Sequence, residues 1–189
     1  MAGAGGDPHI KPTKGLAMTA ETITIRTARP ADLAAADALF SESYPILLRG
    51  DYPPSVRVLA IPLISRAQPH LLASGTYFLA EDADGRLVGA GGWTRAARVR
   101  EVGQVRHVVT DHRRTRRGIG RALMAHIFST AREAGIRHLQ CQSTRTAVPF
   151  YSACGFRELG PIEVPLQPGI SFPAVAMERD LAATPSGAD

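Results

Sequence analysis

The sequence predicts one domain of the α/β (α+β) class, with a single-layer, mixed but mostly antiparallel, twisted sheet of about seven strands and about four helices packed on it. Three observations predict this fold. The chain has 189 residues, 44% of them apolar and 21% charged, which is typical of one soluble domain with a real core. Short runs with the two-residue period of strands alternate with segments of helical period. Finally, Asp84-Gly85 stands between two apolar runs and indicates a tight hairpin.

The first half of the chain is predicted to contain three strands and two helices. Pro30 suits the first turn of a helix, and the alanine-rich residues after it are helix formers. The prolines and the glycine of 44–54 predict an irregular segment, and the second helix is expected to end before Pro69. The predicted elements are a strand over 22–27, helices over 31–40 and 55–67, and strands over 76–81 and 86–91.

The second half begins with a strand and then changes to helical spacing. Ile119, Leu123 and Ile127 recur every four residues, which gives one apolar helix face, and Gly135 supplies the stop. Thr146 is expected to cap a short helix that Gly155 ends. The predicted elements are a strand over 102–110, a helix that starts at 119, a strand over 136–142, a short helix up to 154, and strands over 156–159 and 172–177.

Composition separates an N-terminal extension from the domain. Residues 1–17 are rich in glycine and proline and hold both lysines of the chain, so we expect a flexible extension over 1–17 and the domain over 18–189. No run approaches the ~18 apolar residues of a membrane span, and no apolar segment of a secretory signal follows the first methionine. Cys141 and Cys154 are therefore expected to be reduced and unpaired, and the protein to be cytoplasmic.

A basic segment, Arg95–Arg121, carries nine arginines against two acidic residues, which indicates an anionic partner. Within it a strand leads into an arginine-rich turn, and Gly118 and Gly120 then open a helix. The first backbone amides of a helix have no internal partner, so this turn could hold a phosphate. The two glycines alone do not decide between a phosphate-binding turn and a basic loop that is simply exposed to solvent. A dinucleotide fingerprint would need a glycine where Leu123 stands, and a Walker loop needs a lysine that the domain lacks.

Two motifs carry a resemblance to a known family. The run Thr115-Arg116-Arg117-Gly118-Ile119-Gly120-Arg121-Ala122-Leu123 resembles the acetyl-CoA loop of the GNAT (Gcn5-related N-acetyltransferase) superfamily. About 25 residues downstream, the run 147–156 is similar to the second hallmark of that family, a helix bearing Phe-Tyr followed by Gly-Phe. The resemblance extends from Thr22 to about Leu181, in the element order that the family uses.

The resemblance implies a cofactor site and a general acid. It implies that backbone amides from Arg116 to Arg121 hold the pyrophosphate of coenzyme A, and that Val108–Thr110 pair with the pantetheine arm. It also implies that Tyr151 protonates the departing thiolate, whereas the sequence without the motif favours a core tyrosine. The implied cofactor-binding residues are Val108, Val109, Thr110, Thr115, Arg116, Arg117, Gly118, Ile119, Gly120, Arg121 and Thr144.

The general base is open at this stage. Many relatives carry a glutamate early in the strand that starts at Val102, but this chain has Val102 there, with Glu101 one residue away and therefore on the opposite face of a strand. His107 is the second candidate, and a hydrogen-bonded structural histidine is the alternative for it. The histidines show no HxH or HExxH spacing, so no metal site is expected.

The resemblance thus predicts an N-acetyltransferase that moves the acetyl group of acetyl-CoA to an amine by direct attack. The alternatives are an acetyl-CoA-binding module without catalysis, and an RNA- or polyanion-binding protein that uses Arg95–Arg121. No aromatic-rich strand offers base stacking, so nucleic acid is not expected. The acceptor, a small-molecule or protein amine, is left open, as is a homodimer; the loops around 45–69, 93–100 and 161–172 are expected to select the acceptor.

Overall fold

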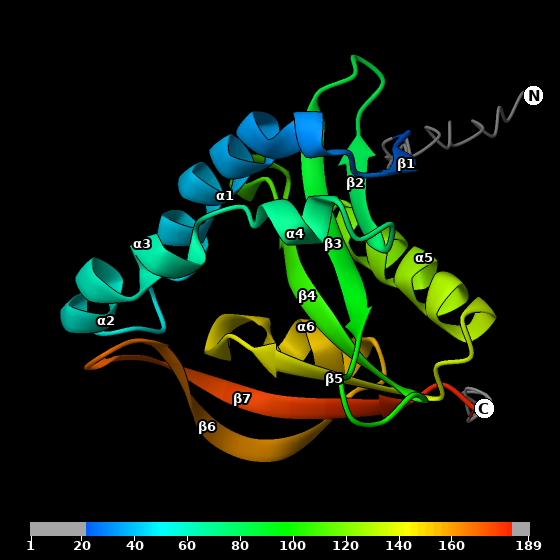
Figure 1. Ribbon diagram of the computed structural model, residues 1–189. Coiled ribbons are helices and arrows are strands. Elements are labelled where there is room, and N and C mark those ends of the chain that lie inside the picture. The colour runs from blue at the N-terminus through cyan, green and yellow to red at the C-terminus, as the bar shows by residue number, and fades with distance from the viewer. Residues whose placement is uncertain (1–21, 183–189) are drawn as a thin grey trace, which may run out of the picture.

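The computed structural model describes residues 22–182, so the predicted extension 1–17 lies outside the described residues. Figure 1 shows one strongly curved sheet with the helices of the first half on one face and α5 on the other. In chain order the elements are β1 (Thr24–Thr27), the 3-10 turn η1 (Pro30–Asp32), α1 (Leu33–Leu47), α2 (Pro54–Leu59), α3 (Ile61–Ile64), α4 (Pro69–Leu72), β2 (Tyr77–Glu81), β3 (Leu87–Arg95), β4 (Val102–Thr110), the turn η2 (His112–Arg114), α5 (Ile119–Glu133), β5 (His138–Ser143), the turn η3 (Arg145–Ala147), α6 (Val148–Ala153), β6 (Arg157–Gln167) and β7 (Ile170–Asp180).

The strands form a seven-stranded sheet in the order β1-β2-β3-β4-β5-β7-β6. Every neighbouring pair is antiparallel except β4 and β5, which are parallel. The predicted fold class is confirmed: the sheet is mixed, mostly antiparallel and a single layer. The one parallel pair follows from the long α5 crossover, because parallel neighbours cannot be joined by a hairpin.

The core has two parts, one on each face of the sheet. Alternate residues of β2 enter different clusters: Tyr77 and Leu79 pack with α1, α3 and α4, whereas Phe78 and Ala80 pack with α5. This is the two-residue period of a strand whose faces are both covered. The apolar face predicted for α5 is confirmed, since Ile119, Leu123 and Ile127 are all at most 1% exposed.

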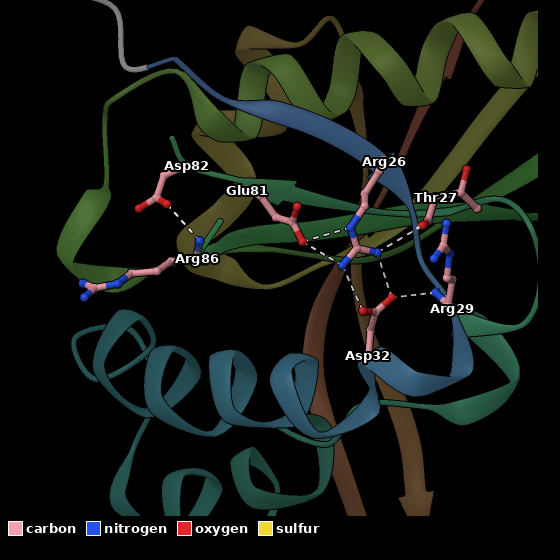
Figure 2. Close-up of polar contacts among 7 residues, drawn as sticks. All are labelled: Arg26, Thr27, Arg29, Asp32, Glu81, Asp82 and Arg86. Carbon is pink, nitrogen blue, oxygen red and sulfur yellow. Dashed lines mark hydrogen bonds and ion pairs between the residues drawn. The ribbon is translucent and has the colours of Figure 1, made fainter. Parts of the chain in front are cut away.

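An ion-pair network fixes the start of α1 (Figure 2). The Arg26 guanidinium on β1 donates from Nη1 and Nη2 to the two carboxylate oxygens of Asp32, both at 2.9 Å, and from Nε to Glu81 Oε1 at 2.9 Å. Figure 2 also shows Asp82, whose Oδ1 accepts the Arg86 backbone amide at 2.9 Å and closes the hairpin between β2 and β3. These contacts position the helix and the hairpin that flank the site described below.

The helices of the first half differ from the sequence prediction at their prolines. The first helix does not end near residue 40 but continues to Leu47: Pro45 lies in its last turn and removes the one intrahelical bond that its missing N–H would donate, and the helix ends two residues later. The single helix predicted over 55–67 is two, α2 and α3, since Pro62 cannot donate to the preceding turn. Pro69 begins α4, an element that the sequence reading missed, rather than only ending a helix.

The C-terminal strands are longer than predicted, and 161–172 is not a loop. β6 and β7 form a long hairpin that turns at Gly169, whose φ is +77°. Pro161 and Pro165 lie within β6, which is the edge strand of the sheet, where a residue without an N–H is tolerated. Ile162, Val164 and Leu166 alternate with exposed residues and pack against the core.

Two further expectations concern the cysteines and the membrane. Cys141 and Cys154 are both free thiols, as predicted. Within residues 22–182, no helix combines the length and the apolar character that crossing a bilayer requires.

Candidate functional site

The site begins where β4 and β5 separate. They pair only at three positions, from Val102 opposite His138 to Gln104 opposite Gln140, although β4 runs on to Thr110 and β5 to Ser143. Beyond Gln104 the edge of β4 that faces β5 therefore has no strand partner there. A parallel pair that opens in this way leaves backbone donors and acceptors for a ligand that lies between the strands.

A bulge in β4 shapes this opening. Ala90 pairs with Val109 and Gly92 with Arg106, so Gly91 alone stands opposite both His107 and Val108. His107 has a φ of +42°, a left-handed conformation that is uncommon outside glycine. A Cβ on Gly91 would lie 2.9 Å from Val108 Cγ2 and 3.2 Å from Val108 Cα, so the close approach of β3 to the bulge requires a glycine.

A cavity of about 300 Å³ fills the gap between the separated strands. β4 supplies residues 104–108 to its wall and β5 supplies 141–143, while Thr144 and Tyr151 contribute from η3 and α6. The other side is closed by α1, by the α3–α4 region and by the β6–β7 hairpin. Of the three segments expected to select the acceptor, 45–69 and 161–172 line this cavity and 93–100 does not. Trp93 is a core residue instead, 4% exposed, with its Nε1 donating to Thr130 Oγ1 at 3.1 Å.

Tyr151 faces the cavity from α6. Its ring is held edge-on between Phe150 and Phe156, with centroids at 5.2 Å and 5.3 Å. Its hydroxyl makes no hydrogen bond to any residue of the described part of the chain and is not fully enclosed. Burial raises the pKa of this phenol well above its ordinary value, so the group is protonated at neutral pH and can donate a proton or a hydrogen bond.

His107 also lines the cavity. Its ring stacks on Phe40 of α1, with centroids 5.7 Å apart, and its Nε2 lies 2.9 Å from Gln68 Nε2. Burial, with a smaller effect of Arg106, lowers the pKa of His107 to about 4. The imidazole is therefore neutral at pH 7, and it is also hydrogen-bonded, as the structural alternative requires.

Glu101 lies away from the cavity. It precedes β4 at the end where β4 and β5 are paired, its side chain is 62% exposed, and its Oε1 lies 3.7 Å from Arg137 Nε. The structure thus brings His107 and Tyr151 together in one cavity and places Glu101 elsewhere.

The arginine-rich turn lies at the other end of β4. Gly118 is the N-cap of α5 with a φ of +84°, and no side chain caps the helix. Arg116 also has a positive φ, of +62°, and a Cβ on Gly118 would meet nothing within 4 Å. Exposed amides in this conformation form an anion-binding concavity at the positive end of the helix dipole. Arg114 ties the turn down through an ion pair of 2.7 Å to Asp82, whose side chain is 5% exposed.

The turn and the cavity are linked through α6. A Cβ on Gly120 would lie 3.1 Å from the ring of Phe150, next in sequence to Tyr151, and 3.7 Å from Thr110 Cγ2. Val108 lines the cavity, Val109 is buried in the core, and the residues from Thr115 to Gly118 are exposed. The turn before α5 therefore lies close to the helix that carries Tyr151.

Thr144, rather than the predicted Thr146, provides the cap at this point of the chain. The Thr144 hydroxyl accepts the Ala147 amide at 3.3 Å and so caps η3, whereas Thr146 Oγ1 donates to Asp51 Oδ2 at 2.6 Å. The Thr144 hydroxyl keeps its own proton for a ligand, and the residue lines the cavity.

Sequence reasoning missed several cavity residues, because they come from elements far apart in the chain. Tyr44 reaches the cavity from α1 and Gln68 from the position just before α4, where prolines obscured the helix boundaries. Arg106 had been counted only as part of the basic segment. The one signal present in the sequence was Gly91-Gly92 opposite a histidine in a strand, which is typical of a bulge.

Comparisons with known proteins agree with this architecture. No curated protein matches, whereas the solved structures include a GCN5-related N-acetyltransferase from Rhodopseudomonas palustris, at 18% identity over 86% of this chain and 98% of that one, with a TM-score of 0.71. A putative acetyltransferase from Salmonella typhimurium, solved with acetyl-CoA, matches at 16% identity over 89% and 99%, with a TM-score of 0.62. The N-acetylglutamate synthase of Neisseria gonorrhoeae, solved with coenzyme A and N-acetylglutamate, matches at 19% identity over 86% of this chain and 36% of that one, with a TM-score of 0.61.

At such identities these structures show a shared fold. Membership of a family rests on a separate finding, because the acetyltransferase (GNAT) domain family matches residues 61–178, more than half of the chain and both motifs. This chain belongs to the GNAT acetyltransferase family.

Proposed function

We propose that this acyltransferase moves the acetyl group of acetyl-CoA to the amine of a small molecule by direct attack. The observation that carries the proposal is the cavity between β4 and β5, which is lined by Tyr151, whose hydroxyl bonds no described residue, and by the end of the strand that leads to the glycine turn before α5. Relatives of the same fold have been solved with coenzyme A or acetyl-CoA, which supports the choice of donor.

The donor would bind along the line from α5 to the cavity. The pyrophosphate would accept hydrogen bonds from the amides of Arg116 to Arg121, and the arginines would add charge. The pantetheine arm would pair with the free edge of β4 at Val108–Thr110, taking the place of a neighbouring strand. The thioester would then reach the cavity beside Tyr151.

Catalysis would follow from positions in this cavity. The amine nitrogen attacks the thioester carbonyl carbon, the carbon–sulfur bond of the resulting tetrahedral intermediate breaks, and Tyr151 gives its proton to the leaving sulfur. The free phenol pKa is near 10, comparable to that of a thiol. Burial in the cavity raises the pKa of the Tyr151 hydroxyl, and the same desolvation would raise the pKa of the leaving thiol, so both pKa values move in the same direction.

The amine nitrogen also loses protons. It loses one as the tetrahedral intermediate becomes the amide, which balances the proton that Tyr151 gives to the sulfur, and an ammonium acceptor must lose another before attack. Of the two candidate bases, His107 lines the cavity and Glu101 does not, so we propose His107 as the nearer acceptor of that proton. A base whose pKa is about 4 removes a proton from an ammonium group poorly. The acceptor would therefore react mainly as the fraction that is already neutral in solution.

The arginines of Arg95–Arg121 do not favour the polyanion-binding alternative. Several are engaged within the fold: Arg113 pairs with Glu42 at 3.2 Å, Arg114 pairs with Asp82, and Arg106 donates to Thr94 Oγ1. They point to different elements rather than forming one face for a nucleic-acid backbone.

Thermal denaturation with acetyl-CoA tests donor binding, and a matched pair of variants tests where the donor binds. A ligand that binds the native state raises Tm, so acetyl-CoA should stabilise the parent protein. Gly120→Glu places a negative charge where the pyrophosphate is expected and should abolish the shift. Gly120→Ala adds the same Cβ beside Phe150 without the charge and should keep most of it. Equal shifts in both variants would contradict the assignment of the turn.

Turnover tests the reaction. Release of free coenzyme A thiol, followed with a panel of amino acids, simple amines and aminoglycosides, should depend on the amine. Stabilisation by acetyl-CoA without turnover of any acceptor would favour the binding module without catalysis.

A further inference from the structure

Arg106 brings a positive charge to the wall of the cavity. It lies on β4 next to the bulge, is only partly exposed, and lines the cavity. Its Nε donates to Thr94 Oγ1 at 3.0 Å, which fixes the plane of the guanidinium. Within residues 22–182, no acidic side chain pairs with Arg106, and the four N–H donors of its terminal nitrogens have no partner.

No other lining residue balances this charge. Among the described residues that line the cavity there is no aspartate and no glutamate, and His107 is neutral at pH 7. A cavity of this kind disfavours a cationic acceptor such as a polyamine or an aminoglycoside, since each brings more positive charge than the reacting amine.

Burial makes the unpaired cation costly. Desolvation lowers the pKa of Arg106, and no nearby anion opposes this effect. A partly buried charge gains most from a partner that is desolvated with it, and a planar guanidinium matches a carboxylate through two parallel hydrogen bonds.

The remaining wall opposite β4 and β5 is mostly apolar. Leu63 and Ile64 come from α3, Val164 and Leu166 from β6, and Phe172 from β7. The volume of about 300 Å³ is at the lower end for ligand sites, which suits a small molecule rather than a folded partner.

We propose that the acceptor is a small amino acid-like amine whose carboxylate binds the terminal nitrogens of Arg106 and whose apolar side chain packs against the α3 and β6–β7 wall. This inference rests on the proposed function, because it names the class of acceptor for the same cavity. Arg106 is thereby a specificity-determining residue that binds the substrate away from the reacting atoms.

The first experiment compares acids with their amides on the unmodified protein. L-Leucine and L-phenylalanine should be acetylated with a kcat/KM about 10- to 100-fold higher than L-leucinamide and L-phenylalaninamide, as expected for a charge-assisted pair. The α-ammonium group of an amino acid amide is more acidic than that of the free amino acid, so a larger fraction of the amide is neutral and reactive. The measured preference for the free amino acid is therefore a lower limit of the contribution of its carboxylate. Amides that react as well as the acids, after each rate is divided by the neutral fraction of its amine, would overturn the proposal.

The second experiment changes the arginine. Arg106→Gln should lower kcat/KM for the acids about 10- to 100-fold and leave the amides within about threefold, so that the preference disappears. Arg98→Gln removes an exposed arginine of the same basic segment and should change neither. A loss that is equal for acids and amides would show a structural role and overturn the proposal. If Arg106→Gln does not fold, Arg106→Lys is the second variant. It keeps the positive charge without the paired donors of the guanidinium, so it should retain part of the preference for acids over amides.

A binding measurement separates this inference from the proposed function. Failure of acetyl-CoA to stabilise the protein or to be consumed would refute the acetyltransferase proposal alone. Titration calorimetry with N-acetyl-L-leucine and its amide needs no turnover: tighter binding of the acid, lost in Arg106→Gln, would support the carboxylate site, and equal binding would overturn it. In the same variant the stabilisation by acetyl-CoA should be unchanged, because Arg106 faces the acceptor side.

Discussion

The hydroxyl of Tyr77 donates a hydrogen bond of 2.9 Å to the carbonyl oxygen of His107, across the whole width of an intervening strand. Tyr77 lies on β2 and His107 on β4, and Gly92 of β3 stands between them in register with Tyr77. A Cβ on Gly92 would come within 2.7 Å of Tyr77 Cδ2, so only a glycine lets the ring pass. Tyr77 on β2 thus stabilises the bulge in β4, although β3 lies between the two strands.

Tyr77→Phe should destabilise the protein by about 1–3 kcal/mol, because it leaves a buried carbonyl without its donor. Acetyl-CoA should also bind more weakly, since Val108 follows the bulge directly. Chemical denaturation measures the first effect and titration with acetyl-CoA the second. Tyr52→Phe is the control: its hydroxyl bonds Pro173 and Arg145 away from the bulge, so stability should fall while acetyl-CoA binding does not.

Gly91→Ala should disturb the bulge itself. The new Cβ would stand 3.2 Å from Val108 Cα, a backbone atom that cannot rotate away, so we expect a loss of about 1–3 kcal/mol, typical of overpacking. The KM for acetyl-CoA should rise with it. Gly50→Ala, where a Cβ would meet nothing within 4 Å, should leave both quantities close to those of the parent. If Gly91→Ala matches Gly50→Ala, the bulge does not depend on this glycine.

Tyr151→Phe should lower kcat by about 10²- to 10⁴-fold, the usual contribution of general acid catalysis. Binding of acetyl-CoA should change little, because the proton transfer is made only in the transition state. The melting temperature should stay within a few degrees, since the ring remains and its hydroxyl bonds no described residue. Steady-state kinetics at saturating acetyl-CoA give the answer, and a kcat within about threefold of the parent would remove Tyr151 from the mechanism.

The neutral state of His107 should appear as a pH dependence of stability. Its pKa is about 4 in the fold and near 6.5 in an unfolded chain, so the unfolded state binds more protons between these values. Stability is therefore fully present above pH 6.5 and is lost as the pH falls towards 4, with about 2 kcal/mol gone at pH 5.

His107→Asn should remove this part of the pH dependence, and asparagine tolerates the positive φ of the position. The free energy of unfolding of the parent and the variant is compared at pH 5 and pH 7.5. If the free energy of unfolding changes by the same amount between pH 5 and pH 7.5 in both proteins, His107 does not titrate as described. Because of this low pKa, the rise of kcat/KM with pH above 6 should follow the acceptor amine rather than His107.

The sequence by itself determined the fold class, the order of the strands along the chain and the position of the glycine turn before α5. These features are local: Ile119, Leu123 and Ile127 set the buried face of α5, and Gly118 ends a strand-to-helix turn whatever packs around it. Tyr151 was found through a local motif, and the cavity placed it beside His107.

Only the tertiary structure decided which candidates meet and where the charge of the acceptor side lies. Glu101 and His107 are six residues apart in sequence, but Glu101 precedes β4 at the end that pairs with β5, whereas His107 lies at the bulge, where the two strands have separated. In the sequence, Arg106 is one of nine arginines in the basic segment. The structure distinguishes it, because its side chain bonds Thr94 and lines a cavity with an apolar β6–β7 wall and no acidic residue among those described. Burial and pairing depend on elements distant in sequence, and they, rather than residue type, determine what a charged side chain can bind.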